Sequence, residues 1–182
     1  MVDWEVVDDS IEVVMTLKNF DISDWIGNEG ERGIYLSLGL GSLVMNNSDA
    51  LTCYMGFYGT DSDNNTFICT ELTLGSATIT RWWDPDGITS YMDNGITFNG
   101  NMADFSVKVV RPLQVSQSYG YYLEKGKVHD VNWAWGEHYP TDAMPLWPHS
   151  TSDRGSGTLD LQASSAYLAT VSFLALILSN LF

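Results

Sequence analysis

The sequence predicts an all-β fold, namely an antiparallel β-sandwich of the immunoglobulin-like type followed by one hydrophobic C-terminal helix. Stretches of alternating apolar and polar residues recur along the chain, and turn-forming residues separate them at the close spacing of a sandwich or barrel. No stretch before Ala163 has a convincing helical period. Because 182 residues suffice for one domain and a short appendage, we expect a sandwich over residues 1–161 and a separate segment over 162–182.

The predicted strands combine β-branched or aromatic residues with alternation of apolar and polar positions. They cover residues 5–17, 34–40, 50–58, 66–73, 77–82, 88–91, 105–110 and 128–135. Clusters rich in Gly, Asn, Asp and Pro mark turns between them. These are Asn28-Glu29-Gly30, Asp84-Pro85-Asp86-Gly87, Asp93-Asn94-Gly95, Asn99-Gly100-Asn101 and Lys125-Gly126-Lys127.

The C-terminal segment predicts attachment to a membrane. No residue after Asp160 is charged, and residues 166–182 read AYLATVSFLALILSNLF, long enough with their uncharged approach to cross a bilayer as a helix. Apolar residues occupy every face, which favours a membrane span over a buried amphipathic helix. A tail anchor and a cleaved lipid-anchor signal both fit the pattern. The opening Met1-Val2-Asp3-Trp4 lacks the basic and apolar regions of a signal peptide.

The charge balance excludes one class of partner. The formal net charge is −15 with only eight basic residues, so the chain lacks the basic surface that nucleic-acid binding requires, and we expect no nucleic-acid partner. An acidic surface is commonly a solubilising one, although it also steers basic protein partners. The seven Trp and nine Tyr fill a sandwich core or line a site for a flat ligand.

The two cysteines, Cys53 and Cys69, flank a segment whose middle, residues 60–65, is rich in turn formers. If its arms pair about that turn, the cysteines lie opposite one another, and a cross-strand disulfide fits an oxidising compartment. Two buried free thiols are the alternative. Sequons at Asn46 and Asn64 predict a glycoprotein and agree with a domain outside the cytosol.

Residues 33–49 read GIYLSLGLGSLVMNNSD and contain the most ambiguous side chain of the sequence. A strand breaks at Gly39-Leu40-Gly41, and Met45 follows just before a polar cluster. A thioether placed there is either gap filler or a soft metal ligand. The residues alone leave both interpretations open.

The order of several motifs resembles the DOMON family, in particular its haem-binding members such as the cytochrome domain of cellobiose dehydrogenase. The resemblance covers residues 4 to about 161. The motifs are Trp4 with the first strands, Gly39-Leu40-Gly41 with Met45 and Ser48-Asp49, Arg111-Pro112-Leu113, Trp133-Ala134-Trp135-Gly136, and His149 followed by Arg154-Gly155. The stretch Arg81-Trp82-Trp83-Asp84-Pro85-Asp86-Gly87 departs from the family pattern.

The resemblance implies a DOMON-type sandwich that holds one b-type haem with a methionine and a histidine as axial ligands. Carried over to this sequence, these ligands are Met45 and His149. An imidazole and a thioether together fill both axial positions, and such an iron passes electrons rather than activating oxygen. No CxxCH motif is present, so the haem b would be bound non-covalently.

Other residues compete for these roles or complete the pocket. His138, which we place in a loop, is the rival of His149, whereas His129 is expected to be a packed or surface histidine and Met55 a core residue. Arg81 and Arg111 are candidates for pairing haem propionates, with a structural ion pair as the alternative for Arg111. Trp133 is a candidate for the aromatic wall of the pocket.

The sequence therefore predicts a membrane-tethered electron-transfer domain rather than an enzyme, since no catalytic constellation has recognisable spacing. Its partner is expected to be a separate redox protein or a membrane complex. We expect the sandwich to lie outside the cell or in another non-cytosolic compartment, with an organelle membrane as the alternative. A haem-free module that binds carbohydrate, and a structural subunit of a membrane assembly, are the alternative functions.

Overall fold

The computed structural model describes residues 1–44, 48–74, 79–83, 90–115, 120–140 and 149–162, with only the backbone at 79–83 and 90–94. The described residues form ten strands and contain no helix. The strands are β1 (Val2–Val7), β2 (Ser10–Asp21), β3 (Gly33–Leu40), β4 (Asp49–Gly56), β5 (Ile68–Leu74), β6 (Ile79–Trp83), β7 (Ser90–Asn99), β8 (Met102–Pro112), β9 (Val128–His138) and β10 (Arg154–Asp160).

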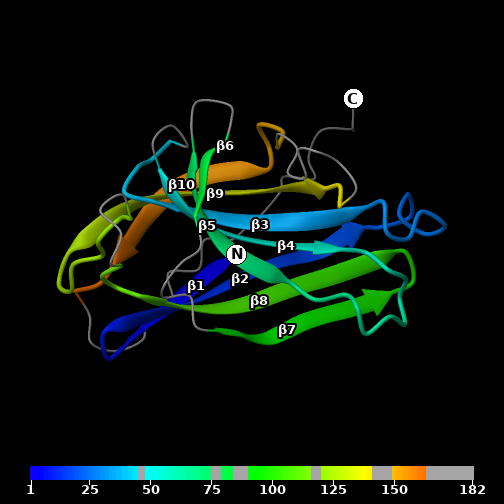
Figure 1. Cartoon of the computed structure of the whole chain (residues 1–182), viewed down its shortest axis with the longest axis horizontal. Helices are drawn as coiled ribbons and strands as arrows, with labels where there is room; N and C mark the ends of the chain where they lie inside the picture. The colour runs from blue at the N-terminus through cyan, green and yellow to red at the C-terminus, as the bar shows by residue number, and fades with distance from the viewer. Residues whose placement is uncertain (45–47, 75–78, 84–89, 116–119, 141–148, 163–182) are drawn as a thin grey trace, which may run out of the picture.

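The strands form two antiparallel sheets that lie one over the other (Figure 1). The smaller sheet has the order β1-β2-β8-β7, and the larger one has the order β10-β9-β3-β4-β5-β6. Strand β3 pairs with β4 on one side and with β9, about a hundred residues later in the chain, on the other. The predicted antiparallel β-sandwich is confirmed.

The core lies between the sheets and follows from period-two alternation. In β8 every second residue faces inward, and Phe105, Val107 and Val109 are fully buried. They meet Leu38 and Leu51 of the larger sheet in one apolar cluster. Burial of this apolar surface is the main favourable contribution to folding.

The predicted first strand, residues 5–17, is a hairpin. Strands β1 and β2 pair with Val7 opposite Ser10, so the chain reverses at Asp8 and Asp9. Asp8 has a φ of 52°, a left-handed conformation that aspartate tolerates because its short side chain bonds locally. The sequence prediction missed this turn because apolar residues continue on both sides of it, as they do within a single strand.

Two other boundaries differ from the prediction. The predicted turn at residues 93–95 lies inside β7, where the register with β8 shifts between Met92 and Gly95. The turn-forming residues therefore lie in a β-bulge within β7, and the strand continues past them. Strand β10 was not predicted because its glycines lower β-propensity, yet it pairs with β9 from Arg154 to Asp160.

The predicted C-terminal helix, residues 162–182, lies outside the described residues from 163 onward. Within the part of the chain that the structure describes, no helix is long and apolar enough to span a membrane. The membrane attachment stays a prediction.

Candidate functional site

The six-stranded sheet is buried on both faces at its centre. All eight residues of β3 are buried. Ile34, Leu36 and Leu38 face the smaller sheet and belong to the core. The alternate residues, including Tyr35 and Ser37, point to the outer face, and no strand of the described part packs there. A sheet face with no strand against it is normally solvated, so this buried outer face is a candidate site.

Small side chains form the middle of this outer face. Ser37 of β3 lies opposite Ala134 of β9 and Thr52 of β4, and these residues are 1% to 8% exposed. The Ser37 and Thr52 hydroxyls bond one another at 2.7 Å, which reduces their demand for water. We call these three buried residues, Ser37, Thr52 and Ala134, the floor; the two hydroxyls among them satisfy one another.

At one end of the floor, Asn132 holds the loop that leads to Met45. Its side-chain amide donates to the carbonyls of Ser42 and Val44 at 3.0 and 3.2 Å. A Cβ on Gly39 would lie 2.5 Å from the Asn132 side chain, so only glycine lets this side chain cross β3. Met45 itself lies outside the described residues, but its neighbour Val44 is placed at the outer face.

At the other end of the floor, Tyr35 holds the segment that carries His149. The His149 backbone hydrogen-bonds the Tyr35 phenol. Burial of that phenol and the nearby Asp153 carboxylate raise the pKa of Tyr35, whereas the His149 bond opposes the rise. A Cβ on Gly136 would lie 2.7 Å from the Tyr35 ring, so the glycine makes room for the ring on β9. The segment is held again where the Trp135 amide donates to the Asp153 carbonyl at 2.9 Å.

One nitrogen of the His149 ring contacts the carbonyl of the next residue. Its Nδ1 lies 3.1 Å from the carbonyl of Ser150. A carbonyl only accepts, so Nδ1 carries the proton of the neutral ring and Nε2 carries the lone pair. Fixing the tautomer through the second nitrogen is how proteins prepare a histidine for iron or zinc.

The two ends of the floor are a suitable distance apart for a shared flat ligand. Gly39, beneath Asn132, and Tyr35 are four residues apart on β3, about 13 Å at the rise of an extended strand. The structure places Val44 at one of these ends and the His149 backbone at the other, whereas Met45 lies outside the described residues and both ligand roles stay predictions.

The other histidines have structural surroundings. His138 ends strand β9 instead of lying in a loop as predicted. It is paired with Gly33, on the same outer face as Tyr35, and is 5% exposed with its ring 4.9 Å from that of Tyr54, so its rivalry with His149 stays a prediction. His129 is also buried, with Nε2 3.0 Å from the Glu124 carbonyl and Nδ1 3.1 Å from the Tyr121 hydroxyl. This confirms His129 as a packed histidine.

The remaining predicted residues lie elsewhere or are not described. Trp133 pairs with Leu38 and packs against the core, so it is on the opposite face of the sheet from Tyr35. Met55 is a core residue on the same inner face, as predicted. The backbone of Arg81 pairs with Thr73, but its side chain lies outside the described part, so its role toward a propionate stays a prediction.

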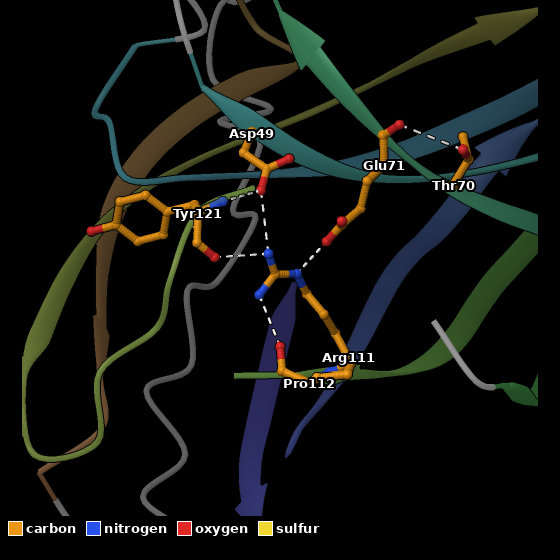
Figure 2. Close-up of polar contacts among 6 residues, drawn as sticks. All are labelled: Asp49, Thr70, Glu71, Arg111, Pro112 and Tyr121. Carbon is orange, nitrogen blue, oxygen red and sulfur yellow. Dashed lines mark hydrogen bonds and ion pairs between the residues drawn. The ribbon is translucent and has the colours of Figure 1, made fainter. Parts of the chain in front are cut away.

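Arg111 forms a buried ion pair with two carboxylates, as the alternative interpretation expected (Figure 2). It comes from β8 of the smaller sheet and is 0% exposed. Its Nε donates to Glu71, its Nη2 donates to Asp49 at 3.2 Å and to the Tyr121 carbonyl at 2.8 Å, and its Nη1 donates to the Pro112 carbonyl at 3.0 Å. We call Asp49, Glu71 and Arg111 the Arg111 cluster. These bonds tie the two sheets together, and a propionate contact by Arg111 stays a prediction.

The Arg111 cluster carries more negative than positive charge when both carboxylates are ionised. The pKa of Glu71 is raised to about 7: burial is the largest cause, the Arg111 charge opposes it, and the Asp49 charge adds to the rise. Burial likewise raises the pKa of Asp49 against the opposing hydrogen bonds from Tyr121 and Arg111. Among the described residues, Glu71 Oε2 and Asp49 Oδ1 have no hydrogen-bond partner. Burial therefore favours the protonated form of both carboxyl groups, against the effect of Arg111.

The sequence contains a signal for these carboxylates that our interpretation did not use. In β8 the inward positions run Ala103, Phe105, Val107, Val109, Arg111, and in β5 Glu71 follows Cys69 at the same spacing of two. A charged residue at a core position needs a partner of opposite charge. Alternation alone therefore indicated that Arg111 and Glu71 are buried and paired.

Cys53 and Cys69 form a disulfide, and they are direct cross-strand partners in β4 and β5. This decides between the two alternatives that the sequence left open. Among the described residues, no group of three or more His, Cys, Asp or Glu side chains is placed to hold a metal ion.

Comparison with known proteins identifies relatives by structure alone. No known protein family matches the sequence, and no curated protein matches it. The fold is similar to the cytochrome domain of cellobiose dehydrogenase from Myriococcum thermophilum, with a TM-score of 0.52, 16% identity, and coverage of 92% of this chain and 76% of that one. It is also similar to the cytochrome b domain of pyranose dehydrogenase from Coprinopsis cinerea, with a TM-score of 0.50, 13% identity, and coverage of 88% and 75%. The predicted resemblance to DOMON-type cytochrome domains is confirmed at the level of the fold.

Proposed function

We propose that this protein is a b-type cytochrome domain that carries single electrons through one non-covalently bound haem. The observation that carries this proposal is the buried outer face of the six-stranded sheet. Its floor of Ser37, Thr52 and Ala134 lies between the Met45 loop and the His149 segment. The likeness in fold to two cytochrome domains supports the same function.

The residues of this face fit a haem in chemistry as well as in position. His149 would bind the iron through Nε2, because the Ser150 carbonyl holds the proton on Nδ1. Met45 would also bind the iron, and its sulfur would favour the reduced state. When bound, the haem would supply a one-electron couple.

The chain's own residues would position these ligands and exclude water. Asn132 fixes the carbonyls on the N-terminal side of Met45, and Tyr35 fixes the backbone of His149. Both anchors are themselves buried, at 4% and 6% exposure. A ligand sphere held by rigid strands keeps reorganisation on electron transfer small, which is the property an electron carrier needs.

We propose further that the domain is tethered to a membrane by residues 162–182, is glycosylated, and works in a non-cytosolic compartment with a separate redox protein. The Cys53–Cys69 disulfide supports an oxidising compartment. Asn64 of the second sequon is exposed in the loop between β4 and β5, where a glycosyltransferase has access. A mass change after enzymatic deglycosylation that disappears in Asn64→Gln would support its modification.

The deciding experiment is reconstitution of the chain with haemin. We expect the absorption spectrum of a low-spin, six-coordinate b-type cytochrome at one haem per chain. His149→Ala and Met45→Ala are each expected to convert the iron to high spin or to lose the haem, because each removes one axial ligand.

Matched variants distinguish the loss of an iron ligand from a loss of folding. Met55→Leu changes a methionine in the core and conserves its volume, so it is expected to leave the spectrum unchanged. His138→Gln changes the rival histidine and is expected to do the same. A folded protein that takes up no haemin would overturn the cytochrome proposal and favour a haem-free ligand-binding or structural module.

A further inference from the structure

Strand β10 forms one edge of the six-stranded sheet. It pairs with β9 along its whole length without a shift in register, and no other strand of the described part pairs with it. Natural sheets protect such edges with proline, lysine or a bulge, because the free backbone groups of an edge can pair with a further strand. The β10 sequence, RGSGTLD, contains neither proline nor lysine. Within the part of the chain that the structure describes, this edge is therefore open to a further strand.

The hydrogen bonds at the two ends of β10 show which backbone groups point to the open edge. The Trp135 amide donates to the Asp153 carbonyl, and the Leu161 amide donates to the Lys127 carbonyl, each at 2.9 Å. Odd-numbered residues of this segment therefore bond to the neighbouring chain segment that contains β9. In an antiparallel ladder the bonding direction alternates, so the amides and carbonyls of the even-numbered residues point to the open edge.

The even-numbered side chains of β10 complement those of a second copy. In an antiparallel pair of β10 strands centred on Gly157, Arg154 lies opposite Asp160 of the second copy, and Ser156 lies opposite Thr158. These four residues are exposed, and among the described residues neither Arg154 nor Asp160 has an ion-pair partner. Opposite charges and pairs of hydroxyls are favourable cross-strand neighbours. Sliding the strands by two residues in either direction removes both ion pairs.

The glycine at the centre of this pairing is not required by the packing of a single chain. A Cβ added to Gly157 would meet no atom within 4 Å, and its φ is not positive. By contrast, a Cβ on Gly155 would lie 2.3 Å from the Trp133 ring, so one chain alone requires that glycine. A glycine inside a strand lowers β-propensity and often marks the close approach of another backbone. In the centred pair the two Gly157 residues form such a close approach, with Cα atoms about 4.5 Å apart.

We propose that two copies of this chain associate by antiparallel pairing of their β10 strands. The two six-stranded sheets then form one continuous sheet, related by a two-fold axis that passes between the two Gly157 residues. The axis is perpendicular to the sheet, so the outer faces of both copies lie on the same side. The Trp4 indole of β1 donates to the Asp160 carbonyl at 3.5 Å, and this oxygen keeps a second lone pair for an amide of the other copy.

Association through one strand pair is expected to be weak. The formal net charge of −15 makes two copies repel one another, and one strand pair buries less surface than the roughly 1,200 Å² of a standard interface. We expect a dissociation constant between micromolar and millimolar. Sedimentation equilibrium of the full chain in mild detergent should therefore show a protein mass that rises from monomer toward dimer as the concentration is raised to about 1 mM.

Cysteine cross-linking tests the pairing and its register. The native pair, Cys53 and Cys69, forms a disulfide, so a Gly157→Cys chain has one free thiol. Beside the two-fold axis the two thiols are close enough for a disulfide, and mild oxidation should give a covalent dimer on a non-reducing gel. Thr158→Cys is the register control, because its two thiols lie diagonally and should cross-link about tenfold more slowly. Equal rates for the two variants, or a faster rate for Thr158→Cys, would overturn the proposal.

Charge reversal tests the two ion pairs without an added thiol. Arg154→Asp and Asp160→Arg each place like charges opposite one another in the dimer, so each should weaken association about tenfold. An equimolar mixture of the two variants restores opposite charges at both positions and should associate about as well as the unaltered chain. Lys18→Asp and Asp61→Arg make the same changes in net charge at exposed positions outside β10, and they should leave association unchanged.

The results decide the proposal independently of the cytochrome function, because none of these measurements needs haem. A chain that stays monomeric up to about 1 mM would overturn the proposal. A mixture of the two charge variants that associates no better than either variant alone would overturn it as well. Urea unfolding of each variant verifies that weaker association does not come from a loss of folding.

Discussion

The two faces of the six-stranded sheet are built from the same strands but have different compositions. On the inner face, Leu36, Leu38 and Leu51 join residues of the smaller sheet in one apolar cluster. On the outer face, the neighbouring positions carry Ser37, Thr52 and Ala134, which are just as buried. Both faces are withdrawn from water. The outer face also carries a small apolar cluster of Ala50, Leu72 and Leu74, but among the described strands only the inner face packs against an opposing sheet.

The inner face is expected to contribute mainly to stability, and the outer face mainly to the proposed function. Interlocking apolar side chains provide the free energy of folding, and truncating them leaves a cavity. Small and hydroxylated side chains contribute little by burial, and the proposed haem site lies on this face. Variants that act on one face and spare the other test this division.

The largest loss of stability is expected from Leu38→Ala on the inner face. Leu38 is 1% exposed, and its truncation should lower the free energy of unfolding by about 2–5 kcal/mol through lost transfer energy and a cavity. Urea unfolding followed by tryptophan fluorescence measures it. Haemin uptake per folded molecule should stay unchanged, and a loss of uptake at full folding would break the separation of the two faces.

A similar loss is expected from removing the disulfide on the inner face. Replacing both Cys53 and Cys69 by alanine removes a cross-link between residues 16 apart, which should cost about 3 kcal/mol because the unfolded chain regains entropy. Comparing the urea midpoints of the two proteins measures this cost. An equal midpoint would mean that native packing alone holds β4 and β5 in register.

The outer face should respond in ligand binding more than in stability. Ala134→Leu adds a branched side chain to the floor and should lower haemin affinity about tenfold or more, with a stability loss of about 1–3 kcal/mol from overpacking. Haemin titration and urea unfolding of the same variant give both numbers. Undiminished affinity would show that the ligand does not lie above the floor.

The smallest effect is expected from the hydroxyl pair of the floor. Ser37→Ala leaves Thr52 without its 2.7 Å bond and should cost about 1 kcal/mol. The double variant Ser37→Ala with Thr52→Val removes both polar groups, so it should recover part of that loss. A double-mutant cycle by urea unfolding measures the coupling, and a value near zero would mean that water satisfies the pair.

Local patterns in the sequence predicted most strands. They missed the features that depend on pairing with a neighbouring strand. Alternation and β-branched residues located β3, β8 and β9, because side-chain direction along a strand is fixed by the backbone. The Asp8-Asp9 turn, the bulge within β7 and the glycine-rich β10 were missed. In each case the pairing with a neighbouring strand, which propensity does not report, decides the structure.

The sequence by itself determined the all-β class and the motif order that resembles DOMON cytochromes, while the preference for His149 over His138 as a ligand stays a prediction. Only the tertiary structure decided that Asn132 holds Val44 and Tyr35 holds the His149 backbone on one face of the sheet, and that Trp133 lies on the other. It also decided which carboxylates meet Arg111. The physical reason is the separation of the interacting residues along the chain. Alternation and turns depend on adjacent residues. A shared face, an ion pair between sheets and the pKa of a buried carboxyl depend on residues that folding brings together from distant parts of the chain.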